Sequence, residues 1–326
     1  MIVGVTVNDI RGRDLDRLGL LQAAPKADRD EARSLLRPPV LARFCPSARA
    51  IRIQFDPPRG RLPTNPSICR HRGELQCVIR TLNYRLMPER KWVVDDPDGI
   101  VRTVNYLGRL RLNGEFVEPK PMRDLDPTPK QPSKISGYED VRIVSIKGTL
   151  TGSATVCDRD LDERRRIVRL HLTASGNVKR ADVQLTYQAH EKNWMPLSVG
   201  GEFAWIYSID PTAILPGPLR SCPFALDHLR GGAAIEYGDG YLCVMHEVID
   251  TDSSRIYLHR FVRLDKRFNV TAVSPAWVFA RHGIEFCAGI AYNKGEIVLS
   301  YGVEDREAWI MRINAKEIED MKWNTP

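Results

Sequence analysis

The stretch GELQCVIR, residues 73–80, sets the pattern from which the fold can be predicted. Gly73 is followed by a short run rich in apolar residues, and the run ends seven positions later at the basic Arg80. A glycine turn leading into an apolar run of this length is typical of a β-hairpin. We therefore interpret the stretch as the second strand of a hairpin.

The same unit returns four more times along the chain. In each copy a glycine precedes, by six or seven residues, the end of an apolar strand; the pairs are Gly148 and Thr155, Gly201 and Ser208, Gly240 and His246, and Gly295 and Tyr301. Five units fit between Asn65 and Ile313. Repetition of this kind predicts an all-β chain with radially arranged sheets, a five-bladed β-propeller. A β-sandwich of regular hairpins is the alternative.

The N-terminal part of the chain differs from the repeats. Residues 9–37 have helical composition, interrupted near Pro25. We expect residues 1–60 to form a partly helical extension that packs on a propeller domain spanning residues 61–326. The proline-rich residues 118–134 are predicted to be a surface connection.

Composition excludes several classes of protein. The 326 residues are 43% hydrophobic and 27% charged, as in a globular domain, and no apolar run approaches the length of a membrane span. The net charge of +7 predicts weak attraction to anions, but the basic residues are scattered, so no nucleic-acid partner is expected. Seven cysteines without C-x-x-C spacing indicate reduced, buried thiols in a cytoplasmic protein, and no residue set demands a metal.

The stretch SGYEDVRIV, residues 136–144, has a specific place in a propeller. The innermost strand of each blade points its end at a central funnel, so this stretch would bring Glu139 and Asp140 to the funnel mouth. Because neighbouring strand residues face opposite sides, we expect one carboxylate to face the funnel and the other to hold a loop. A plain ion pair between Asp140 and Arg142 is the alternative.

Five short motifs occur in order at the blade starts and at the close of the last blade. They are Asn65–Pro66, Gly137–Arg142, Lys192–Pro196, Arg230–His246 and SYGVED at 300–305. Over residues 60–315 this series resembles the five-bladed propeller mannoside phosphorylases and hydrolases of glycoside hydrolase family 130. The order and spacing together are more specific than any single motif.

The resemblance implies a carbohydrate-active enzyme that cleaves or forms a β-mannoside-like bond by phosphorolysis or hydrolysis. The family's general acid matches Asp140, with Glu139 beside it. Its phosphate-binding positions match Lys192, Arg230 and His246, and Arg80 and Arg142 would add positive charge at the same funnel. Inorganic phosphate would be a co-substrate, and no cofactor is implied. An oligosaccharide or a sugar phosphate is the expected substrate.

A second group of motif residues is expected to contact sugar. Trp194 is singled out because an indole in a loop can stack on a pyranose ring; the full set is Asn65, Asn193, Trp194, Tyr301, Glu304 and Asp305. Hydrolysis would need a second carboxylate roughly 6.5–9.5 Å from the acid. The candidates for this base are Glu139, Glu285, Glu304 and Asp305.

Two departures from the family pattern leave alternatives open. Val141 stands where the family has proline, and Ser208 stands where the phosphorylases have an arginine. With one guanidinium lost, a glycosyltransferase or a glycan-binding propeller without catalysis stays open on the same fold. The sequence also leaves homo-oligomer formation open.

Overall fold

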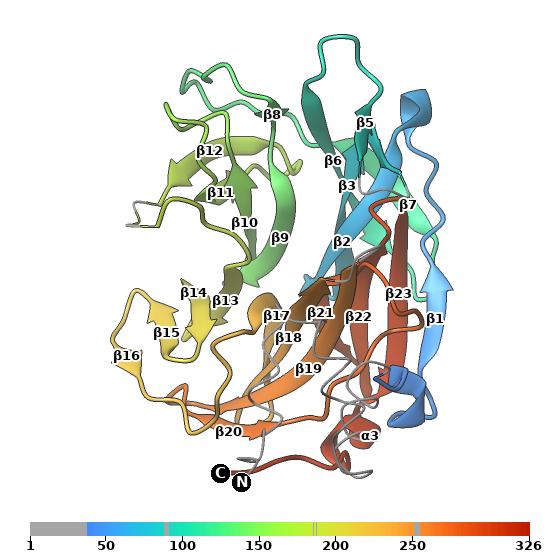
Figure 1. The fold of residues 1–326 in the computed structure, drawn as a ribbon, viewed down its shortest axis with the longest axis vertical. Coiled ribbons are helices and arrows are strands. Elements are labelled where there is room, and N and C mark those ends of the chain that lie inside the picture. Colours follow the sequence, from blue (N-terminus) through green and yellow to red (C-terminus); the bar gives the residue numbers. More distant parts are fainter. Residues whose placement is uncertain (1–37, 88–90, 185, 187, 251–254) are drawn as a thin grey trace, which may run out of the picture.

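The computed structural model describes residues 38–326 apart from 88–90, 185, 187 and 251–254. Within these residues five sheets are arranged around a common centre (Figure 1). Each has four strands along its main path, and β2, β9, β13, β17 and β21 lie nearest to the centre. The five-bladed β-propeller predicted from the hairpin repeat is confirmed.

In four of the five blades the strands follow one another along the chain from the centre outward, and in the fifth the outermost strand comes from the N-terminal side. In chain order, and each from its innermost strand to its outermost, the five blades are β2 (Leu62–His71), β3 (Glu74–Leu82), β6 (Val101–Leu110) and β7 (Phe116–Pro121); β9 (Glu139–Ile146), β10 (Thr149–Val156), β11 (Arg166–Leu172) and β12 (Val178–Val183); β13 (Met195–Val199), β14 (Glu202–Ile209), β15 (Thr212–Leu215) and β16 (Leu219–Arg220); β17 (Arg230–Tyr237), β18 (Gly240–Asp250), β19 (Arg255–Asp265) and β20 (Val270–Val273); and β21 (Glu285–Asn293), β22 (Glu296–Val303), β23 (Glu307–Asn314) and β1 (Arg49–Arg52).

The first blade carries two additions. Strand β8 (Ile135–Ser136) pairs in parallel with β6. Strands β4 (Tyr84–Leu86) and β5 (Trp92–Val94) form a separate antiparallel hairpin, which the chain inserts between β3 and β6. The remaining elements are short helices: η3 (Leu41–Arg43), η4 (Pro58–Gly60) and α3 (Ala315–Glu319).

The fifth blade closes the ring. Its outermost strand, β1, comes from the N-terminal side of the first blade and runs antiparallel to β23, with Arg49 opposite Arg312 and Arg52 opposite Trp309. This pairing covers an edge of β23 that would otherwise be open. A strand of the fifth blade therefore lies within residues 1–60, the range expected to form the extension. The helical stretch expected over residues 9–37 lies outside the described residues.

Two-residue turns explain why the glycine repeat marks the blades. In four blades both turn residues have positive φ, as type I′ hairpin turns require; they are Arg72 and Gly73, Lys147 and Gly148, Gly200 and Gly201, and Lys294 and Gly295. In the fourth blade the turn glycine is Gly238, and Gly240 begins strand β18 instead. Each turn fixes the register of its hairpin and so fixes which residue reaches the funnel.

The core is divided among the contacts between neighbouring blades. Five separate clusters of buried apolar side chains occur, one for each pair of adjacent blades; for example, Val78 of the first blade packs in one cluster with Val141 of the second. All seven cysteines are free, and all but Cys222 are buried. In the part of the chain that the structure describes, no helix is long and apolar enough to cross a membrane.

Candidate active site

Irregularities in the innermost strands shape the end of the propeller that holds the site. The pairing of β9 with β10 shifts between Ser153 and Thr155, and Asp140 sits in the resulting bulge with a φ of 50°. The pairing of β2 with β3 shifts in the same way, and Asn65 has a φ of 45° there. Asparagine and aspartate tolerate this left-handed conformation better than most residues. Because of these bulges, the side chains of Asn65 and Asp140 do not follow the normal alternation of a strand.

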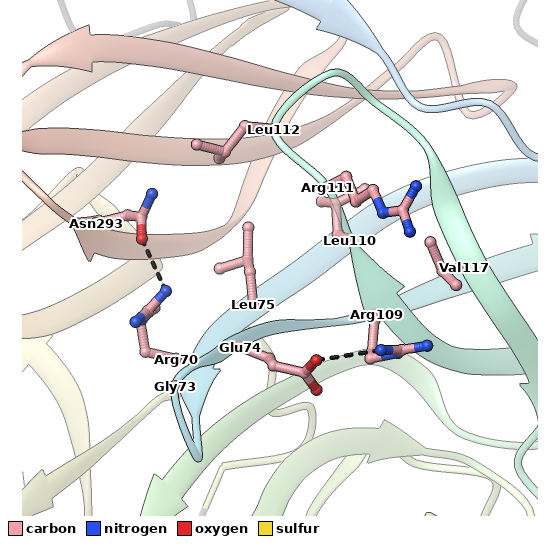
Figure 2. A pocket seen from close by; sticks show the side chains of 10 residues that line it. All are labelled: Arg70, Gly73, Glu74, Leu75, Arg109, Leu110, Arg111, Leu112, Val117 and Asn293. Atoms are coloured by element: carbon pink, nitrogen blue, oxygen red, sulfur yellow. Dashed lines mark hydrogen bonds and ion pairs between the residues drawn. The ribbon is translucent and has the colours of Figure 1, made fainter.

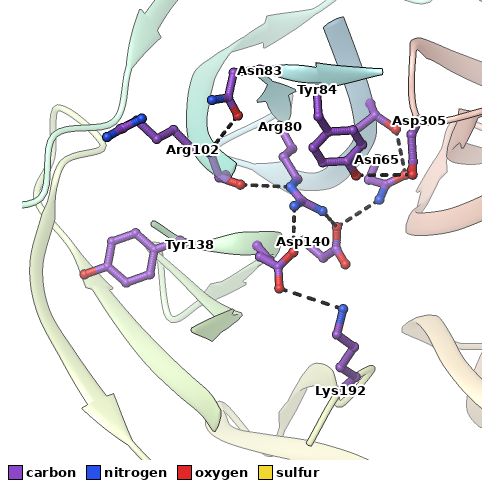
Figure 3. Close-up of polar contacts among 12 residues, drawn as sticks. Asn65, Arg80, Asn83, Tyr84, Arg102, Tyr138, Asp140, Lys192 and Asp305 are labelled. Carbon is purple, nitrogen blue, oxygen red and sulfur yellow. Dashed lines mark hydrogen bonds and ion pairs between the residues drawn. The ribbon is translucent and has the colours of Figure 1, made fainter. Parts of the chain in front are cut away.

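Asp140 is the centre of a buried polar cluster (Figure 3). Its Oδ1 accepts hydrogen bonds from Nη1 of Arg80 and from Nδ2 of Asn65, both at 2.8 Å. Asn65 is held in turn by Thr64, whose hydroxyl donates to Oδ1 of Asn65 at 2.9 Å. The Asp140 side chain is only 13% exposed. The carboxylate is therefore fixed by two donors from the first blade.

Arg80 joins the two acidic residues of the second blade. Its Nη2 donates to Oε1 of Glu139 at 2.7 Å, while its Nε donates to the Thr103 hydroxyl at 3.2 Å. Strand alternation predicted that Glu139 and Asp140 would face opposite sides, and this was wrong. The bulge at Asp140 undoes the alternation, so both carboxylates reach one guanidinium.

Lys192 approaches the same cluster from the third blade. Its Nζ lies 3.8 Å from Oε2 of Glu139, and that oxygen has no hydrogen-bond partner among the described residues. The Lys192 side chain is 39% exposed, whereas Arg80 is 5% exposed. Lys192 is therefore the cation of this cluster that solvent and an incoming anion reach.

The electrostatics of the two aspartates differ in direction. Burial alone would raise the pKa of Asp140, but the charges of Arg80 and Lys192 outweigh burial and hold that pKa well below its ordinary value. Burial raises the pKa of Asp305, and the negative charge of Asp140 adds to the effect. Asp305 accepts a hydrogen bond at Oδ2 from the Tyr84 hydroxyl at 3.2 Å. The site thus holds one strongly ionised carboxylate and one that takes up a proton more readily.

Arg142 braces three blades instead of facing an anion. Its Nη1 donates to the Trp194 carbonyl at 3.0 Å, and its Nη2 donates to Oδ1 of Asn193 at 3.1 Å and to the Gly231 carbonyl at 3.2 Å. Its guanidinium also lies over the Phe286 ring, 5.4 Å from the centroid. Arg142 is 4% exposed, so its expected contact with an anion is corrected to a bracing role, whereas the sugar contact expected of the half-buried Asn193 stays a prediction.

An accessible cation of the fourth blade lies at the start of β17. Arg230 pairs with His246 across β17 and β18, is exposed, and donates from Nη1 to the carbonyls of Asp227 and Leu229. His246 is 2% exposed, and burial, followed by the nearby His259, lowers its pKa well below its ordinary value. The imidazole is neutral at neutral pH, so the expected anion-binding charge at His246 is absent.

Two of the expected sugar contacts belong to the core. Trp194 is 4% exposed, donates to Oε2 of Glu191 at 3.0 Å and packs edge-on against Trp205. Tyr301 is 1% exposed and stacks on Phe279 with ring centroids 3.8 Å apart. Neither ring has a free face for a sugar. Burial between blades, which single-strand patterns do not reveal, removes both from the surface.

The other candidate bases for hydrolysis are tied to loops. Glu285 accepts hydrogen bonds from the backbone N–H groups at Phe279, Ala280 and Arg281, and burial raises its pKa to about 7. Glu304 accepts from the backbone N–H of Ile284 at 3.0 Å. Glu139, which shares Arg80 with Asp140, and Asp305 remain as carboxylates near Asp140. The described residues contain no group of three or more His, Cys, Asp and Glu side chains arranged to hold a metal.

A surface pocket lies elsewhere on the propeller. It has a volume of about 260 Å³ and is lined by residues around the Gly73 turn, including Arg70, Glu74 and Arg109 (Figure 2). Seven strand residues, or about 23 Å, separate this turn from Arg80. The pocket is therefore at the far end of the first blade and takes no part in the Asp140 cluster.

The fold and the site together define a class: a five-bladed β-propeller with a buried, charged cluster where the innermost strands converge. No protein-family model matches the chain, and no curated protein matches its sequence.

Solved structures with the same architecture do match. A β-1,2-mannobiose phosphorylase from Listeria innocua has a TM-score of 0.56 and 14% identity, covering 83% of this chain and 98% of its own. A mannose phosphorylase from Leishmania mexicana, MPT-4, in complex with phosphate has a TM-score of 0.56 and 14% identity, covering 92% and 98%. MPT-1, a GDP-Man-dependent mannosyltransferase from the same organism, has a TM-score of 0.51 and 12% identity, covering 82% and 90%. The chain therefore shares the fold of these mannose-processing propellers.

Sequence reasoning missed Tyr84 as a member of the site. It lies on the inserted β4–β5 hairpin, which belongs to no repeat, and only its contact with Asp305 identifies it. The structure does bring together Asn65, Arg80, Glu139, Asp140 and Lys192, which the sequence proposed from three different blades.

Proposed function

We propose that this chain is a carbohydrate-active enzyme that makes or breaks a β-mannoside-like glycosidic bond, with Asp140 as its acid–base residue. One observation carries the proposal. Asp140 occupies a backbone bulge with positive φ, and two donors from another blade fix its buried carboxylate beside an accessible lysine. Strained backbone and perturbed pKa values together are typical of catalytic positions.

The protonation state of Asp140 suits the bond-forming direction. In synthesis from a sugar 1-phosphate, the carboxylate accepts the proton of the acceptor hydroxyl. At the same time the bond between the anomeric carbon and the phosphate oxygen breaks, phosphate leaves, and the new glycosidic bond forms. In phosphorolysis the same group returns that proton to the glycosidic oxygen, as microscopic reversibility requires. An Asp140 whose pKa is lowered is ionised in the ligand-free protein and is ready to act as the base.

Lys192 and Arg230 are the cations we assign to the phosphate. Both are accessible, whereas Arg80 is already paired with two carboxylates. Arrival of a phosphate would also oppose the effect of Lys192 and raise the pKa of Asp140 toward the protonated form that phosphorolysis needs. Ser208, whose hydroxyl donates to the Pro211 carbonyl, stands where the phosphorylases that the chain resembles have an arginine, so Arg230 is the one guanidinium of this set.

A glycosyltransferase is the second candidate. An ionised Asp140 serves equally as the base for an acceptor hydroxyl when the donor is a nucleotide sugar, and one structural neighbour is a GDP-Man-dependent mannosyltransferase. The two candidates differ in the leaving group and not in the role of Asp140.

The test is a donor screen with product analysis. Purified protein is incubated with mannose 1-phosphate, or with GDP-mannose, and a panel of sugar acceptors, alongside Asp140→Asn and the control Asp182→Asn, which changes an exposed ion pair with Arg180. We expect product from one donor, lost in Asp140→Asn and kept in Asp182→Asn. Product formation that persists in folded Asp140→Asn refutes the role of Asp140. If the wild type forms no product with either donor, and cleaves no β-mannoside with or without phosphate, the proposal that the chain is such an enzyme is refuted.

A further inference from the structure

The inserted β4–β5 hairpin places an exposed aromatic residue beside the site. The Trp92 side chain is 50% exposed. Its ring contacts the Tyr84 ring edge-to-face, with centroids 4.5 Å apart. The Tyr84 hydroxyl in turn donates to Asp305. Trp92 is thus one side chain removed from the carboxylates of the cluster.

The two faces of the hairpin explain this arrangement. Leu86 pairs with Trp92 and Tyr84 with Val94, so these four side chains share one face. Tyr84 at the base of that face is 6% exposed, whereas Trp92 toward the tip is open. The face therefore runs from the buried Tyr84 out to the half-exposed indole of Trp92.

An exposed indole next to convergent polar groups has the composition of a sugar-binding subsite. Ligand sites combine apolar and aromatic walls with a few placed polar groups. A pyranose presents C–H groups on its ring faces and hydroxyls at its edge, so it can pack on an indole while its hydroxyls meet Asp305 and Tyr84. Half-exposure of a tryptophan without such a partner leaves a large apolar surface in water.

The position of Trp92 also indicates which sugar it would hold. In Figure 3 Lys192 reaches the cluster from one side, and Tyr84 with Asp305 from the other. If phosphate sits at Lys192, displacement at the anomeric carbon with inversion puts the second sugar on the opposite side of that carbon. That side is the one where Tyr84 lies, and Trp92 packs against the Tyr84 ring.

We propose that Trp92 and Tyr84 form a subsite in which the indole stacks on the acceptor sugar, the ring that receives or leaves the transferred mannosyl unit. The subsite rests on the proposed function for its assignment to the acceptor. Its ligand class is a neutral pyranose in a β-linked oligosaccharide.

Binding without turnover tests the subsite separately from the reaction. Asp140→Asn, which is expected to form no product, is titrated by calorimetry with a β-linked mannobiose and with a panel of other neutral β-linked disaccharides, with and without Trp92→Ala or Trp92→Phe. Tyr292→Ala is the matched control, because Tyr292 is an aromatic of similar exposure, 47%, on β21 next to the Gly295 turn. We expect Trp92→Ala to weaken binding at least tenfold, Trp92→Phe less than threefold, and Tyr292→Ala not at all.

Two results overturn the subsite: binding in Trp92→Ala within twofold of its parent, or no binding of any panel member to the parent. If binding falls as expected but the wild type turns over no donor, the proposed function fails and the subsite stands. Where turnover is found, the Michaelis constants show whether Trp92 contacts the acceptor sugar or the donor sugar. Trp92→Ala should raise KM for the acceptor at least tenfold and leave KM for mannose 1-phosphate within twofold, and the reverse pattern contradicts the acceptor assignment.

Discussion

Replacement of Arg80 by methionine should both destabilise the protein and change how its stability depends on pH. Arg80 is 5% exposed and is the shared partner of Glu139 at 2.7 Å and Asp140 at 2.8 Å. Methionine fills much of the volume but leaves two carboxylates buried side by side without their guanidinium. Removing one partner of a buried ion pair typically costs about 3–5 kcal/mol, and we expect a loss of that size at neutral pH.

The sign of the pH effect follows from the pKa of Asp140. In the wild type this pKa is held below its unfolded value, so its contribution to stability is present above about pH 4 and is lost as the pH falls toward the lowered pKa. Without Arg80, burial and the neighbouring Glu139 dominate and raise the pKa. The variant then loses stability as the pH rises through that raised value, because a buried carboxylate must ionise.

Urea unfolding at pH 5 and pH 8 measures the effect, with Arg109→Met as the control. Arg109 also contacts two glutamates, Glu74 and Glu118, but its side chain is 43% exposed. We expect the free energy of unfolding of Arg80→Met to fall more at pH 8 than at pH 5, and that of Arg109→Met to change by less than about 1 kcal/mol at either pH. A loss below about 1 kcal/mol in Arg80→Met, or one equal at both pH values, would refute the reasoning.

Three further predictions address the frame around the site. Arg142→Lys should lower the free energy of unfolding by about 2–4 kcal/mol, because one ammonium group cannot replace the guanidinium that donates to Trp194, Asn193 and Gly231. A thermal melting temperature equal to that of the wild type would contradict this structural role of Arg142. Asn65→Ala should be less stable than Asn65→Gly, since both lose the hydrogen bond to Asp140 but only alanine strains the φ of 45°; urea midpoints compare the pair, and equal values would remove the backbone argument. Iodoacetamide should label Cys222 first in the native protein, because Cys222 is half-buried, whereas the other cysteines are buried and burial raises the pKa of Cys69 and Cys243 to about 12. Mass spectrometry identifies the labelled thiol, and earlier labelling of a buried cysteine would contradict the burial of these thiols between the blades.

Local chemistry determined the blade pattern, and so it could be read from the sequence. Turn pairs such as Lys147–Gly148 and Lys294–Gly295 fix two-residue hairpins, and each hairpin sets the register of an innermost strand. Because register decides which residue reaches the funnel, the place of Arg80 followed from the repeat, whereas Asn65 and Asp140 were proposed from the motifs of the resembling family.

Tertiary contacts decided the rest, because they join residues that no local pattern connects. Strand β1 is in the fifth blade only because the open edge of β23 lies beside it in space, more than 250 residues later in the chain. Trp194 and Tyr301 look like ligand contacts in their motifs but are covered by neighbouring blades.

The charge states of the site belong to the same category. The pKa of Asp140 depends on its burial and on its distance from Arg80, and the pKa of His246 depends mainly on its burial. Burial and distances between blades cannot be read from the sequence pattern of single strands. The sequence by itself indicated that Asn65, Arg80, Glu139, Asp140 and Lys192 gather at the centre of the propeller. Only the tertiary structure decided which of them stay charged and reachable, since desolvation and ion pairing depend on what every other blade places around them.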